Sequence, residues 1–144
     1  MITISPTHFT EIKEHGTEAY PEECCGAMLG RRDANGAKVT EHIVRIENNW
    51  EDRPGESKHR RFAVTAEDYK ALEAEAKERG LTLLGFYHTH PDHPAEPSGT
   101  DLSYAWPFFS YIILNVTNRE PGQLNSFELN LDTEKFEPVE IQVS

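Results

Sequence analysis

The pattern of hydrophobic and polar positions predicts a helix near the start of the chain. Apolar residues recur at helical spacing after Pro6, and Ser5 is placed to cap the first turn. The apolar stripe of this helix consists of Phe9, Ile12, Ala19 and Tyr20. Pro21 ends it, because the residue before a proline avoids helical geometry.

A second helix is predicted in the middle of the chain, and its composition is mostly charged. Thr65 and Asp68 form a capping-box pattern at its start, and the helix runs to Arg79, where Gly80 stops it. Its apolar stripe is thin, so one face is expected to contact solvent.

Short apolar runs between these helices predict strands. We expect strands at 2–5, 24–30, 38–46, 81–88, 110–116, 123–131 and 136–143. Polar loops are expected at 47–61 and 91–97, and Ser98 is placed to cap a short helix that Pro107 ends. Helices interleaved with hairpins and crossovers predict an α/β fold, a mixed β-sheet flanked by helices. Without repeats or a linker, residues 1–144 are expected to form a single domain.

Composition excludes several classes of function. Fourteen Lys and Arg residues against 25 Asp and Glu give a net charge of −11, which disfavours nucleic acid as a partner. No apolar run is long enough for a membrane span, so we expect no membrane association and a cytoplasmic location. Cys24 and Cys25 are adjacent, which makes a disulfide between them implausible and agrees with a reducing compartment.

The candidate chemistry is concentrated after the central apolar strand. Side chains alternate along a strand, so His88 and His90 point to the same side and can share one metal ion. Asp101, in the first turn of the helix that Ser98 caps, could supply a carboxylate oxygen. Two nitrogens and one oxygen leave an open position on a tetrahedral zinc ion, which is typical of a catalytic site rather than a structural one.

Hydrolysis of an amide at such a site also needs a proton carrier. Glu23 lies at the start of the strand predicted at 24–30, and it can face the site without binding the metal if that strand lies beside the one with His88. Ser98 could donate a hydrogen bond to the developing oxyanion, in addition to capping its helix.

Together these residues resemble a known family. The pattern His-x-His-Pro-x6-Ser-x2-Asp from His88 to Asp101, preceded by Pro-x-Glu ending at Glu23, resembles the JAMM (MPN-plus) zinc metalloisopeptidases, in particular their small prokaryotic members. The resemblance extends over about residues 2–116. It implies the three-layer, cytidine-deaminase-like MPN fold and one Zn²⁺ per chain on His88, His90 and Asp101. It also implies Glu23 as general base and Ser98 as oxyanion stabiliser.

The resemblance further implies an activity and a substrate. Small members of the family cleave after the C-terminal Gly-Gly of a ubiquitin-like or sulfur-carrier protein of the ThiS or MoaD type. Two alternatives stay open: a non-catalytic MPN scaffold that binds protein partners, and a deubiquitinase-like isopeptidase that acts on linked ubiquitin-like proteins. The particular carrier, its pathway and the oligomeric state are not predicted.

For other residues near these motifs, the sequence allows more than one interpretation. Cys24 and Cys25 suit packing, although a second metal site or a nucleophile is the alternative. His93 either contacts substrate or is an ordinary loop histidine. The basic residues of the 47–61 loop either meet an acidic partner or are solvated; they are Arg53, Lys58, Arg60 and Arg61.

Overall fold

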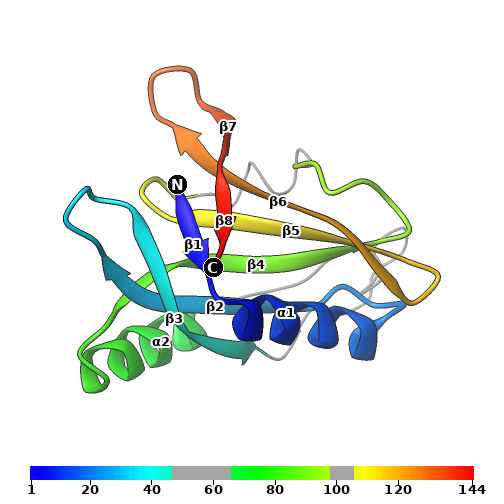
Figure 1. Ribbon diagram of the computed structural model, residues 1–144, viewed down its shortest axis with the longest axis horizontal. Coiled ribbons are helices and arrows are strands. Elements are labelled where there is room, and N and C mark those ends of the chain that lie inside the picture. The colour runs from blue at the N-terminus through cyan, green and yellow to red at the C-terminus, as the bar shows by residue number, and fades with distance from the viewer. Residues whose placement is uncertain (47–65, 98–105) are drawn as a thin grey trace.

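The computed structural model describes residues 1–46, 66–97 and 106–144 (Figure 1). The helices in these ranges are α1 (Pro6–Ala19) and α2 (Ala66–Glu78). The strands are β1 (Ile2–Ile4), β2 (Cys25–Arg32), β3 (Lys38–Ile46), β4 (Thr82–Pro91), β5 (Ser110–Thr117), β6 (Glu120–Asn130), β7 (Lys135–Val139) and β8 (Ile141–Val143). The loop expected at 47–61 and the helix expected after Ser98 lie outside the described residues.

Local sequence signals account for both ends of α1. The Ser5 hydroxyl accepts a hydrogen bond from the His8 backbone N–H at 3.1 Å, which confirms the predicted cap. The helix ends at Ala19, two residues before Pro21, as predicted. Neither helix of the described residues is long and apolar enough to cross a membrane.

All eight strands belong to one mixed sheet, in the order β7-β6-β5-β4-β2-β3-β1-β8. The pairs β1–β3, β1–β8 and β4–β5 are parallel, and the other neighbours are antiparallel. β4 is central, with β2 on one side and β5 on the other. The candidate histidines therefore lie on a strand that is held along both edges.

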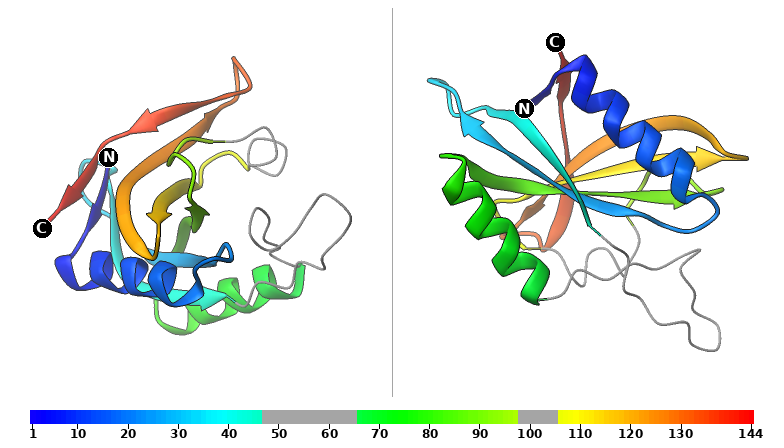
Figure 2. Two further views of the ribbon diagram at one scale, coloured as in Figure 1. Left: turned by 90° about the vertical axis from the view of Figure 1, so that its right-hand side faces the viewer. Right: turned by 90° about the horizontal axis from the view of Figure 1, so that it is seen from below.

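The strand predicted at 136–143 proves to be two strands with different partners. β7 pairs with β6, and β8 pairs with β1 at the opposite end of the strand order. Only Glu140 separates them, so the two ends of the sheet must approach each other. The sheet is therefore curled (Figure 2). The final segment, β7 and β8, runs from β6 at one end of the strand order to β1 at the other.

The two helices cover opposite faces of the sheet. Ile12 of α1 packs with Met28 of β2, whereas Leu72 of α2 packs with the neighbouring residues Ala27 and Leu29. Because adjacent strand residues point to opposite faces, these contacts define two separate cores. The arrangement is helix, sheet, helix, which confirms the predicted mixed sheet flanked by helices.

Candidate metal centre

The central strand is longer than predicted, and it includes both candidate histidines. β4 continues to Pro91, so His88 and His90 are part of the regular strand and share one face. Each is only 2% exposed. Thr89, between them, points to the other face and is fully buried.

The pairing of β2 with β4 brings Glu23 to these histidines. Cys25 is opposite His88, and the Thr89 N–H donates to the Cys24 carbonyl at 3.1 Å, so the antiparallel register continues toward Glu23. Glu23 is 3% exposed. One ligand atom each from Glu23, His88 and His90 lies within 4.8 Å of the others. Residues about sixty-five positions apart thus form a buried group of three potential metal ligands.

The contacts of its two ring nitrogens define the orientation of the His90 side chain. Nδ1 lies 2.7 Å from the Pro94 carbonyl, which can only accept a hydrogen bond, so Nδ1 carries the proton. Nε2 is then the nitrogen with the lone pair, and it lies 3.2 Å from Nε2 of His88. Both Nε2 atoms therefore converge on one location, as two ligands of a single ion would.

The donor set fits a metal ion. Two imidazole nitrogens and a carboxylate oxygen are all ligands that zinc accepts in catalytic sites. A cation would also compensate the cost of burying the Glu23 carboxylate. Asp101 and Ser98, the other predicted site residues, lie outside the described residues, so their roles stay predictions.

Two further hydrogen bonds connect the segment that contains Glu23 to the end of β4. The Thr89 hydroxyl oxygen accepts a hydrogen bond from the Cys24 N–H at 2.9 Å. The Tyr20 hydroxyl donates to the Asp92 carboxylate at 2.6 Å, and this bond lowers the pKa of Asp92. Tyr20, Thr89 and Asp92 are not among the site residues that the sequence motifs predict. The position of Thr89 between two ligands was the one signal that could have drawn attention to it.

Burial explains the state of the two thiols beside Glu23. Cys24 and Cys25 are both reduced and buried. Desolvation raises the pKa of Cys24 to about 11 and also raises the pKa of Cys25. Neutral thiols in apolar surroundings are poor nucleophiles and poor ligands, so the packing interpretation is favoured.

His93 lies directly against the candidate site. Its ring stacks on that of His90, with centroids 4.1 Å apart and planes at 19°. Its Nδ1 is 2.8 Å from the Pro91 carbonyl. His93 therefore supports one side of the His90 ring.

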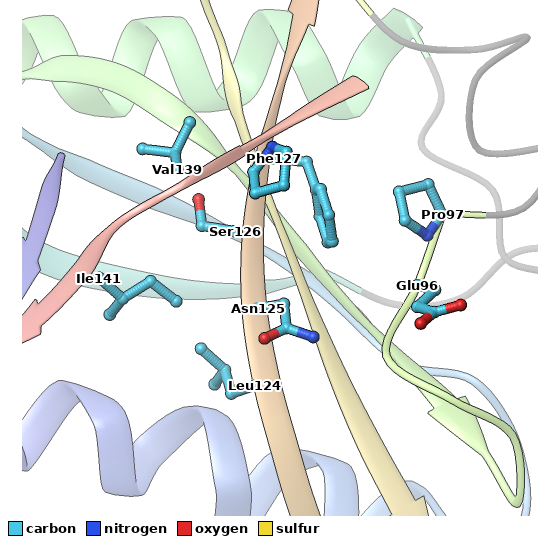
Figure 3. A pocket seen from close by; sticks show the side chains of 9 residues that line it. Glu96, Pro97, Leu124, Asn125, Ser126, Phe127, Val139 and Ile141 are labelled. Atoms are coloured by element: carbon cyan, nitrogen blue, oxygen red, sulfur yellow. The ribbon is translucent and has the colours of Figure 1, made fainter. Parts of the chain in front are cut away.

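A hollow of about 650 Å³ lies beside β6 (Figure 3). The described residues that line it are Glu96, Pro97, Leu124, Asn125, Ser126, Phe127, Pro138, Val139 and Ile141. Glu23, His88 and His90, here called the metal group, are not among them. Glu96 and Pro97, which line the hollow, belong to the same loop, 92–97, as Pro94, whose carbonyl bonds to His90.

Comparison with known proteins identifies the family to which this chain belongs. Residues 5–130 match the prokaryotic homologs of the JAB domain, and the chain belongs to this family. The relationship agrees with the predicted resemblance to JAMM proteins. A curated relative, the desampylase of Haloferax volcanii, is 27% identical over 100 residues, which are 69% of this chain and 66% of the relative.

Solved structures show the same fold. A solution structure of a protein from Desulfitobacterium hafniense has a TM-score of 0.83 and 27% identity, covering 100% of this chain and 93% of the other. Another, from Salinibacter ruber, has a TM-score of 0.76 and 39% identity, with coverage of 100% and 92%. A JAB1/MPN domain protein from Archaeoglobus fulgidus shares the fold at 20% identity, with a TM-score of 0.57 and coverage of 99% and 96%.

Proposed function

We propose that this protein is a zinc-dependent peptidase or isopeptidase that hydrolyses the bond after the C-terminal Gly-Gly of a ubiquitin-like or sulfur-carrier protein. The convergence of Glu23, His88 and His90 in one buried group is the observation that carries the proposal. In this proposal His88 and His90 hold Zn²⁺ together with Asp101. When bound, zinc would lower the pKa of water and polarise the scissile carbonyl.

Glu23 is assigned the proton transfers. Its carboxylate accepts a proton from the attacking water and returns it to the amine that leaves. Support for this role comes from its burial at 3% exposure and from its proximity to both histidines. The neighbouring Glu22 is exposed, so it is a poor candidate for the same task. Ser98 is assigned the hydrogen bond to the oxyanion.

The substrate class rests on chemistry and on the relative in Haloferax volcanii. That relative's name, desampylase, refers to a small archaeal modifier protein. A flexible carrier tail can enter as an extended segment, and backbone pairing with a strand would keep it in register. Glycines suit a tail whose backbone passes close to a buried site, because side chains would clash there.

The test uses a ThiS- or MoaD-like carrier that is extended beyond its Gly-Gly, with products measured by intact-mass spectrometry. We expect a product that ends at the second glycine, no product in chelator, and recovery when zinc is restored. Glu23→Gln should retain zinc but lose turnover by about 100- to 10,000-fold, because an amide cannot accept the proton. Glu22→Gln is the matched control, and it should stay active.

Each alternative has its own outcome in this assay. Binding of the carrier without cleavage, in zinc-loaded protein, would favour the non-catalytic scaffold. Cleavage of linked ubiquitin-like proteins while extended carriers stay intact would favour the deubiquitinase-like isopeptidase. Activity in Glu23→Gln together with loss in Glu22→Gln would show that the general base is assigned to the wrong residue. Loss of zinc in Glu23→Gln would make Glu23 a ligand.

A further inference from the structure

The loop that follows β4 is held by side chains of three different strands. Three consecutive carbonyls of this loop each accept one hydrogen bond from a separate strand. Asn115 of β5 donates from Nδ2 to the His93 carbonyl at 2.7 Å, and His90 of β4 reaches the Pro94 carbonyl at 2.7 Å. Asn125 of β6 donates from Nδ2 to the Ala95 carbonyl at 2.9 Å. The bond that orients His90 therefore lies between two asparagine bonds.

The composition of the loop explains why it needs these donors. Pro91, Pro94 and Pro97 have no N–H group, so the loop has few donors of its own for its carbonyls. Ala95 is 1% exposed, so water has little access to the carbonyl groups around it. Asparagine amides from the sheet satisfy the carbonyls on either side of Pro94 instead.

The register of the sheet places both asparagines on the face of the metal group. His90 is the partner of Asn115 in the parallel pair β4–β5. Asn125 is opposite Ile113, which in turn is the partner of His88. Figure 3 shows the Asn125 amide at β6, with its nitrogen on the side of the loop that carries Glu96 and Pro97.

The amide of Asn115 is itself oriented by neighbours. The Thr117 hydroxyl donates to Asn115 Oδ1 at 3.2 Å, which leaves Nδ2 for the loop. A Cβ atom on residue 122 would collide with Asn115 Oδ1, so Gly122 of β6 makes room for this orientation. A change at Gly122 can therefore disturb Asn115 without touching the loop.

We propose that Asn115 and Asn125 are positioning residues for His90. By fixing the carbonyls on either side of Pro94, they hold the Pro94 carbonyl where it accepts a hydrogen bond from the His90 Nδ1–H, which leaves Nε2 directed at His88. This inference rests on the proposed metal site but not on peptidase activity. Outer hydrogen-bond partners of metal-binding histidines typically contribute 10- to 100-fold to metal affinity.

The first measurement is Zn²⁺ affinity, by competition with a chromophoric chelator. Asn115→Leu plus Asn125→Leu should weaken Zn²⁺ binding by about 10- to 100-fold, with smaller effects for each single change and for Gly122→Ala. Asn130→Leu is the matched control. Asn130 lies on β6, as Asn125 does. Its side chain donates to Glu137 and accepts from the Asp132 N–H, so its loss should lower stability without changing Zn²⁺ affinity. Asn115→Gln and Asn125→Gln retain the donor and should recover part of the affinity.

The second measurement needs no metal. In the metal-free protein, ¹⁵N NMR of the imidazoles should show His90 protonated at Nδ1, and the double variant should show a mixture of tautomers. Zn²⁺ affinity within twofold of the parent in the double variant, or in both single variants if the double does not fold, would overturn the proposal. An unchanged tautomer would overturn it as well. A parent that binds no Zn²⁺ would instead refute the proposed function, while the tautomer measurement would still test the asparagines.

Discussion

Thr89 shows how one residue between two candidate ligands can support the site from the opposite face of the sheet. Its side chain points away from His88 and His90, yet its hydroxyl accepts from the Cys24 N–H and donates to the Cys24 thiol. Gly16 of α1 has no side chain, and this leaves room for the Thr89 methyl group. Thr89 thus fixes the strand that carries the histidines against the residue that follows Glu23.

Replacement of Thr89 should therefore affect stability and turnover together. Thr89→Val keeps the shape but leaves the buried Cys24 N–H without its acceptor, so the free energy of unfolding should fall by about 1–3 kcal/mol. In the carrier assay kcat should fall with little change in KM, because Glu23 is misplaced. Urea unfolding and steady-state kinetics measure the two effects.

Two further variants separate these effects. Thr89→Ser retains the hydroxyl and should recover most of kcat, despite losing the packing of one methyl group. In a Glu23→Gln background, Thr89→Val should reduce kcat no further if it acts through Glu23. Additive losses in the double variant would contradict this interpretation.

Among the strands, a single lysine at the start of β3 links four elements of the sheet region. Lys38 is 2% exposed, and its Nζ lies 3.2 Å from the Leu84 carbonyl and 2.7 Å from the Phe108 carbonyl. It is also 2.9 Å from Ser110 Oγ and 3.0 Å from Glu128 Oε1. Burial lowers the pKa of Lys38, while the bond to Glu128 opposes that change. The ammonium group therefore crosses the interior of the curled sheet from β3 to β4, β5 and β6.

Loss of this ammonium group should weaken the sheet. Lys38→Met retains the apolar stem but removes every donor, which leaves buried acceptors unsatisfied, so the free energy of unfolding should fall by about 2–4 kcal/mol. Lys135→Met, at an exposed position of β7, is the control and should change stability by less than about 0.5 kcal/mol. Equal urea midpoints for the two variants would show that the Lys38 contacts contribute little.

At the scale of the whole molecule, the candidate site combines two histidines of β4 with the segment before β2, which supplies the proposed general base. His88 and His90 come from one strand and Glu23 from the other segment, and the arrangement exists only in the folded chain. An ion that binds the folded state alone stabilises it by mass action. Metal binding and folding are therefore expected to be coupled.

Zinc should consequently raise the melting temperature. At a free Zn²⁺ concentration 100-fold above Kd the gain is about 2.7 kcal/mol, which corresponds to roughly 5–10 °C for a chain of this length. Chelator should reverse the shift, and His88→Ala should abolish it while still folding. Thermal unfolding followed by circular dichroism measures both. A shift of the same size in His88→Ala would mean that zinc binds elsewhere.

The sequence alone determined the features that depend on local periodicity and on short motifs. The cap at Ser5, the end of α1 before Pro21 and the common face of His88 and His90 follow from residues close together in the chain. The full pattern from His88 to Asp101, together with the upstream Glu23, predicted the family, and residues 5–130 match it. Ser98 and Asp101 were predicted by the same motif and stay predictions.

Only the tertiary structure decided which distant residues meet. The register of β2 on β4 brings Glu23 to the histidines, and the partner change at Glu140 curls the sheet. Asn115 and Asn125 have no motif of their own, because an asparagine that donates to a loop carbonyl looks like any other asparagine in a strand. Pairing between distant strands depends on how the whole sheet packs, and no local period encodes that choice.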